Sequence, residues 1–142
     1  MYPNSMETMT SSYQLQVSVE YDLKIIELQF FGLVQTSDFI TLMEEVLSVC
    51  SETGDQYDLL LDMHEMELEL HYHELNGLVD YCKGIANQLG QKNIAILASK
   101  PHTCAAWMIL QRKVLEPSLV FTKLFYEKNY ALAWLKNDLS LL

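Results

Sequence analysis

The chain has 142 residues, a hydrophobic fraction of 50% and a formal net charge of -10, which together predict one globular domain without a disordered linker. The acidic charge would repel phosphate backbones and anionic lipid headgroups, so nucleic acid is not an expected partner. The three cysteines form no Cys-x-x-Cys pair, so they predict neither a disulfide framework nor a structural zinc site. A reducing cytoplasm is the expected location.

The first twelve residues carry no pattern and lack the basic start and apolar centre of a signal peptide. We expect residues 1–12 to form a loose N-terminal arm and residues 13–137 to form the domain. The longest apolar run in the helical regions extends from Cys104 to Leu110, far short of the roughly 20 residues that cross a bilayer. No transmembrane segment is expected.

The start of the domain reads as a β-hairpin. Tyr13–Glu20 alternates polar and apolar residues with period two, which is typical of a half-buried strand. A second strand is expected over Leu23–Phe31, ended by Gly32. The two residues Tyr21 and Asp22 would then form the turn of an antiparallel hairpin.

Alternating helices and strands are expected after the hairpin. The first predicted helix is capped at Thr36 or Ser37 and stops at Gly54. The other predicted helices are His71–Leu89, Pro101–Leu115 and Tyr130–Lys136, and the predicted strands are Tyr57–Asp62, Asn93–Ala98 and Leu119–Tyr126. A helix separates each of these strands from the next, which favours parallel pairing through crossover connections. The expected fold is therefore α/β, with a single mixed five-stranded sheet: an N-terminal antiparallel hairpin and then βαβαβα units.

Five segments carry a resemblance to a known superfamily that extends from about Tyr13 to Lys136. They are Phe31-Gly32, Thr36–Phe39, Tyr57–Asp62, Asn93–Ser99 and Ala131–Leu135. Together they resemble the SpoIIAA-like superfamily, which includes the STAS domains of anti-sigma-factor antagonists and sulphate transporters and is related in shape to SEC14-type lipid carriers. The resemblance implies a non-catalytic regulatory or protein-interaction domain that binds a protein partner or forms a homodimer.

The phosphorylation site of that superfamily has no counterpart here. In the anti-sigma antagonists that the chain resembles, a segment after the third strand carries a phosphorylatable serine at a helix start. The corresponding stretch, Glu67–Glu74, contains neither Ser nor Thr. A phosphoryl switch needs a hydroxyl that can gain charge there, so we expect a domain without that serine switch.

Histidines near the middle of the chain offer the ligand types of a zinc site. His71, His73 and Glu74 lie close together, with His64 upstream. Residues two apart on a helix point in nearly opposite directions, so His71 and His73 would converge only on an extended backbone. Solvated polar residues are the favoured interpretation, and no metal or other cofactor is expected.

A strictly alternating stretch, Met63–Leu70, separates an acidic side from an apolar side. The acidic side carries Glu65, Glu67 and Glu69, and the apolar side carries Met66, Leu68 and Leu70. Three carboxylates could hold calcium, but no Asp-rich loop surrounds them, so a solvated edge is favoured. The apolar side of an edge segment could recruit a partner strand or subunit.

The predicted helix at Pro101 offers several alternatives. Cys104, with His102 two residues before it, could be a nucleophile, but a structural cysteine is favoured. The first backbone amides of this helix, together with Lys100, could hold a small anion. Trp107 lies on an apolar stripe that is core by default, although the excess of apolar residues could leave a surface for dimerisation or an apolar ligand.

An aromatic cluster near the C-terminus is also expected to be core. Its members are Phe121, Phe125, Tyr126 and Tyr130.

Open α/β sheets bind ligands beyond the carboxyl ends of their parallel strands. The residues expected to bind a ligand or partner are Asp62, Met63, His64, Ser99, Lys100, His102 and Trp107. No catalytic residue is expected. Two alternatives stay open: a SEC14-like carrier of a small apolar or lipid-like ligand, and an enzyme that uses Cys104 or a histidine-bound metal.

Overall fold

The computed structural model describes residues 13–54, 56–115, 120–138, 140 and 142. The expected N-terminal arm, residues 1–12, lies outside the described residues. In chain order the elements are β1 (Tyr13–Glu20), β2 (Ile25–Gln35), α1 (Thr36–Thr53), β3 (Asp58–Glu69), the 3-10 turn η2 (Tyr72–Glu74), α2 (Leu75–Leu89), β4 (Lys92–Leu97), α3 (Pro101–Leu110), the wide turn η3 (Gln111–Leu115), β5 (Val120–Phe125) and α4 (Lys128–Lys136).

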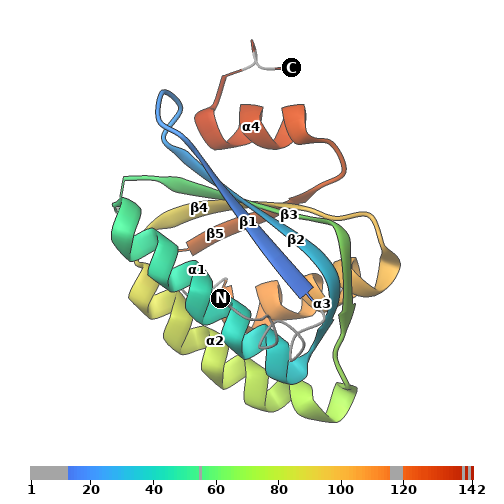
Figure 1. Cartoon of the computed structure of the whole chain (residues 1–142). Coiled ribbons are helices and arrows are strands. Elements are labelled where there is room, and N and C mark those ends of the chain that lie inside the picture. The colour runs from blue at the N-terminus through green and yellow to red at the C-terminus, as the bar shows by residue number, and fades with distance from the viewer. Residues whose placement is uncertain (1–12, 55, 116–119, 139, 141) are drawn as a thin grey trace, which may run out of the picture.

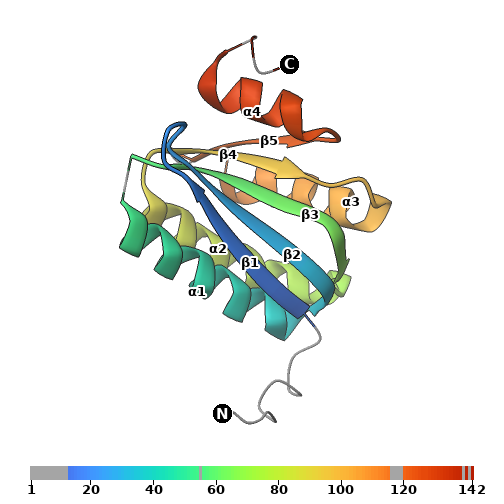
Figure 2. The same cartoon turned by 45° about the horizontal axis from the view of Figure 1, so that its top comes forward.

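The strands form a single mixed sheet of five strands in the order β1-β2-β3-β4-β5. β1 pairs with β2 antiparallel, and the pairs β2–β3, β3–β4 and β4–β5 are parallel. Helices α1, α2 and α3 cover one face of the sheet, and α4 lies on the opposite face (Figures 1 and 2). The predicted α/β fold class and strand arrangement are confirmed.

The two faces bury separate cores. Between the sheet and α1–α3 lies the larger core, in which Leu28 and Phe30 pack with side chains of the helices. Beneath α4, Leu60 and Ala95 pack against Ala131 in a smaller core. Because β3 and β4 are covered on both faces, both appear in the sequence as nearly continuous apolar runs.

The hairpin differs from the sequence prediction in its turn and its length. Glu20 pairs with Ile25, so the chain turns over Tyr21–Lys24 and the predicted two-residue turn is wrong. Lys24 has a φ of 57°, which lets the chain reverse in the left-handed region. Gly32 was expected to end the second strand, but with a φ of 94° it lies within β2, which continues to Gln35.

The elements in the middle of the chain also have different ends from those predicted. β3 does not stop at Asp62 but continues through the alternating stretch to Glu69. Helix α2 begins at Leu75 rather than His71 because η2 precedes it. Helix α3 ends at Leu110, and the chain continues to Leu115 as the π-helical turn η3.

The aromatic cluster predicted as core is largely on the surface. Phe121, Tyr126 and Tyr130 are 57%, 71% and 52% exposed, and only Phe125 is partly buried, where it packs against the Trp134 ring at 5.8 Å between centroids. The physical reason is that β5 is the edge strand of the sheet, while α4 packs mainly over the neighbouring strands.

Candidate functional site

The carboxyl end of β3 projects beyond its neighbour β4. β3 pairs with β4 only from Leu59 to Asp62, but it pairs with β2 as far as Glu69. β4 ends opposite Asp62, so beyond that pair the β4 side of β3 is paired with no other described strand. Successive residues of a strand point their N–H and C=O groups to alternate sides, so this edge presents a row of free backbone groups. We call Met63–Glu69 the open edge of β3.

A β-bulge at the start of the open edge sets which side chains face outward. Gln29 of β2 is opposite Asp62, yet Phe31 is opposite Glu65, so β3 contains one residue more than β2 over this interval. The extra residue reverses the phase of the alternation. Met63 is buried before the bulge, and Met66 and Leu68 are buried after it.

Three glutamates of β3, Glu65, Glu67 and Glu69, form an acidic row that is exposed on the face of the strand opposite α1–α3. Without the bulge, their side chains would point toward these helices. At the bulge itself, the backbone N–H of His64 donates to Asp62 Oδ1 at 3.1 Å, and His64 Nδ1 lies 3.1 Å from the same oxygen. Asp62 and His64 therefore hold the bulge together.

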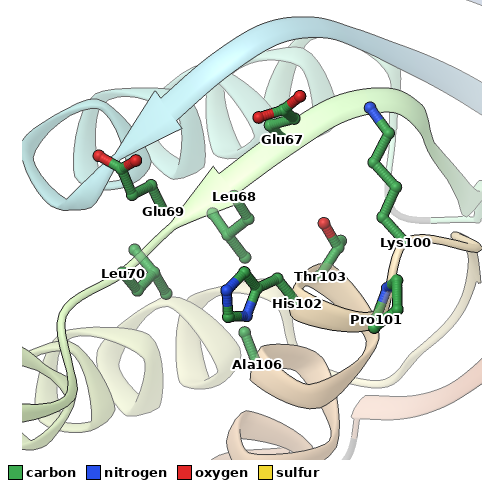
Figure 3. Close-up of a pocket in the computed structure, with 9 residues that line it drawn as sticks. All are labelled: Glu67, Leu68, Glu69, Leu70, Lys100, Pro101, His102, Thr103 and Ala106. Carbon is green, nitrogen blue, oxygen red and sulfur yellow. The ribbon is translucent and has the colours of Figure 1, made fainter.

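A hollow of about 420 Å³ lies between the end of the open edge and the first turn of α3. Figure 3 shows Glu67, Glu69 and Lys100 extending along one side of the strand, whereas Leu68, Leu70, Thr103 and Ala106 lie between the strand and the helix. The hollow thus combines a charged rim with a mostly apolar wall, and the backbone of β3 forms one border.

Thr103 is the unusual side chain of this wall. It is 0% exposed, and its hydroxyl oxygen Oγ1 has no hydrogen-bond partner among the described residues. Burying a hydroxyl without a partner costs free energy. In Figure 3 the hydroxyl points from α3 toward β3, and a polar group in the hollow would reach it only after a neighbouring side chain of the wall moves.

The first turn of α3 also leaves backbone donors at the hollow. The helix starts with Pro101, and its N-cap residue, Lys100, makes no side-chain cap. The first intrahelical hydrogen bond runs from Cys104 N to Lys100 O at 3.0 Å. The amides of His102 and Thr103 precede it and belong to the group of helix-terminal donors that need an outside partner.

The structure brings some of the predicted site residues together and separates others. Lys100 and His102 line the hollow, and Ser99 is exposed at the end of β4. Met63 and Trp107 are only 1% and 7% exposed, and the Trp107 Nε1–H donates to Met63 Sδ at 2.8 Å. These two side chains support the bulge from the core and do not face the hollow.

Sequence reasoning placed the carboxyl end of this strand at Asp62 and so did not include the residues that line the hollow farther along. The sequence interpretation gives Glu67 and Glu69 to a solvated edge and Leu70 to an apolar side that could recruit a partner strand, and it does not include the Thr103 side chain. The alternation of Met63–Leu70 is visible in the sequence, but its continuation of β3 past Asp62 was not predicted. The open edge follows once β3 is seen to be longer than β4.

His71 and His73, weighed as zinc ligands, lie beside and within η2. His71 and His73 stack with their ring centroids 5.8 Å apart, and the neighbouring Glu74 accepts a hydrogen bond from the Thr36 hydroxyl at 2.5 Å. That hydrogen bond lowers the pKa of Glu74. Within the described part of the chain, no three His, Cys, Asp or Glu side chains are arranged to hold a metal.

A small apolar cavity lies inside the larger core. It has a volume of about 50 Å³ and is lined by residues that include Cys82, Leu110 and Thr122. Drug-sized ligands occupy pockets of roughly 300–1,000 Å³. Burial raises the pKa of the Cys82 thiol to about 11, so at neutral pH this thiol is protonated and weakly nucleophilic.

Comparisons with known proteins identify the fold. No protein-family model matches this sequence, and no curated protein matches it. An uncharacterised DUF3478-family protein from Shewanella loihica PV-4, whose structure has a SpoIIAA-like fold, matches with a TM-score of 0.57 at 17% identity, over 87% of this chain and 94% of that one. An anti-sigma factor antagonist from Mycobacterium paratuberculosis matches with a TM-score of 0.57 at 15% identity, over 87% and 94% of the two chains. The chain has the SpoIIAA-like fold.

Among the described residues, no helix is both long and apolar enough to cross a bilayer.

Proposed function

We propose that this chain is a non-catalytic regulatory domain that works by binding a protein partner at the carboxyl end of its parallel strands. The observation that carries the proposal is the open edge of β3 beside the hollow, where strand backbone and charged side chains are available to a partner. The fold shared with an anti-sigma factor antagonist supports a regulatory role.

The proposed domain does not use the phosphorylatable serine of anti-sigma antagonists. The stretch Glu67–Glu74, which includes the end of β3 and η2, contains no Ser or Thr. We propose that partner binding is instead regulated by the amount of partner or of the chain itself. A cytoplasmic location fits this proposal, as does a homodimer if the partner is a second copy.

The carrier alternative receives less support. The cavity inside the larger core, about 50 Å³, is far smaller than the roughly 300–1,000 Å³ of pockets that hold drug-sized ligands. An acyl chain would need the core to open. The enzyme alternative requires a reactive Cys104 or a bound metal, and the fold neighbours add no support for either.

Native mass spectrometry of freshly purified chain tests the proposal, together with denaturing mass spectrometry and alkylation. We expect the 16.4 kDa chain, alone or as a multimer, without a retained small molecule. We also expect Cys104 to react with iodoacetamide no faster than a cysteine in an unfolded peptide. A lipid released on denaturation would support the carrier, and a tightly held metal or a hyper-reactive Cys104 would support the enzyme.

A further inference from the structure

We propose that the open edge of β3 binds an extended segment of a protein partner as an added strand, and that this segment alternates basic and apolar residues. This inference rests on the proposed function and names its site and the chemistry of its partner. The backbone supplies the first argument, because Met63–Glu69 offers one free edge of a strand that is already held on its other side by β2. An incoming strand would complete the hydrogen bonds that β4 leaves unmade.

The length of the open edge sets the length of the segment. Six steps of roughly 3.3 Å separate Met63 from Glu69, which gives an edge of roughly 20 Å. A segment of about six or seven extended residues covers that distance.

Charge determines one side of the segment. Glu65, Glu67 and Glu69 stand in a row on the exposed face of the open edge, and side chains on adjacent strands meet across the same face. Lys or Arg at every second position of the added strand would therefore face this acidic row. An edge of the same acidic composition would be repelled, so the open edges of two copies of this chain are a poor match for each other.

The wall of the hollow determines the other side. The remaining side chains of an added strand would point toward α3, where Leu68, Leu70 and Ala106 form an apolar lining. Apolar residues are therefore expected at the alternate positions. Polar backbone groups of the same strand would pass near the buried Thr103 hydroxyl, for which the described residues provide no hydrogen-bond partner.

A small anion is a poorer occupant of the same hollow. Lys100 and the first amides of α3 would attract it. However, Glu67 and Glu69 line the hollow as well, and the chain carries a formal net charge of -10. Two carboxylates beside one lysine favour a cationic ligand over an anionic one.

The test uses the full chain and a fluorescent peptide, Lys-Val-Lys-Val-Lys-Val-Lys, with Glu-Val-Glu-Val-Glu-Val-Glu as the acidic control. Anisotropy titrations are expected to show saturable binding of the basic peptide and none of the acidic one. In the variant with Glu67→Gln and Glu69→Gln, we expect affinity for the basic peptide to fall about tenfold. A matched variant, Glu20→Gln with Glu52→Gln, changes the net charge equally at exposed positions outside the open edge, and it should lose less than about twofold.

Three results would overturn the inference. They are no binding of the basic peptide, equal losses in the two double variants, and displacement of the peptide by millimolar inorganic phosphate at constant ionic strength. The last result would assign the hollow to an anion. If the basic peptide does not bind while mass spectrometry shows no retained molecule and Cys104 reacts with iodoacetamide at the rate of a peptide thiol, strand addition is refuted. In that case the proposal of a non-catalytic interaction domain stands. A retained lipid or metal would refute the proposed function itself.

Discussion

Replacing Thr103 with valine separates the stability of this domain from its proposed binding. The threonine side chain is 0% exposed, and within the described part of the chain its hydroxyl has no hydrogen-bond partner. Valine keeps the branched shape and a similar helix propensity but has no group to desolvate. The variant should therefore gain about 1 kcal/mol in free energy of unfolding, the lower end of the penalty for a buried unsatisfied group.

The gain is measurable by urea unfolding followed by circular dichroism and by calorimetry. For a domain of this size, about 1 kcal/mol corresponds to a rise in Tm of about 4 °C. Thr122→Val provides the matched control, because the Thr122 hydroxyl is also buried without a partner but belongs to the small apolar cavity rather than the hollow. Both variants should become more stable.

Only one of the two variants should lose binding. Thr103→Val removes a polar group from the wall of the hollow, so its affinity for the basic peptide should fall severalfold, whereas Thr122→Val should bind like the parent chain. A Thr103→Val variant that is destabilised by about 1 kcal/mol or more would refute the reasoning, because it would mean that the hydroxyl already has a partner in the free domain.

Three further substitutions or reactions test the surrounding structure. Trp107→Ala should lower the free energy of unfolding by about 3–5 kcal/mol in urea titrations, because the buried indole packs against Phe39 at 6.2 Å between ring centroids and donates to Met63. A loss below about 1 kcal/mol would contradict this packing. Iodoacetamide at pH 8 should label Cys82 far more slowly than a peptide thiol, because burial raises the pKa of Cys82 to about 11. Mass spectrometry measures the labelling rate, and a rate equal to that of a peptide thiol would show that the core is open. Burial and the neighbouring Glu45 raise the pKa of Tyr13 from 10.0 to about 12, so the folded chain holds this proton more tightly than the unfolded chain. The resulting stability is complete below pH 10 and lost as pH rises toward 12, and Tyr13→Phe should flatten that loss in urea titrations; identical pH profiles would refute it.

The sequence was sufficient to predict the fold class because hydrophobic periodicity reports directly on burial. The runs at Leu59–Leu61 and Ile94–Leu97 are buried on both sides of the sheet, and each is followed by a helix. The alternation after Met63 likewise predicted which side of the strand carries the glutamates, and the exposures agree.

The site was harder to predict because it depends on where neighbouring strands end. Periodicity describes one strand at a time, and it says nothing about the relative lengths of β3 and β4. The bulge at His64 leaves only a small trace in the sequence, two successive polar residues, His64 and Glu65, between Met63 and Met66, and periodicity alone does not identify that interruption as a bulge. The unpartnered hydroxyl of Thr103 emerges only from packing in three dimensions.

Hydrogen exchange of the backbone amides along Met63–Glu69 measures most directly whether the open edge accepts a strand. In the free chain, the amides directed toward β2 should be protected and those directed toward the open edge should exchange quickly. Saturation with the basic peptide should slow the fast set by at least about tenfold and leave the amides of β1 unchanged. Open-edge amides that are already protected in the free chain, or that still exchange quickly in the peptide complex, would contradict strand addition.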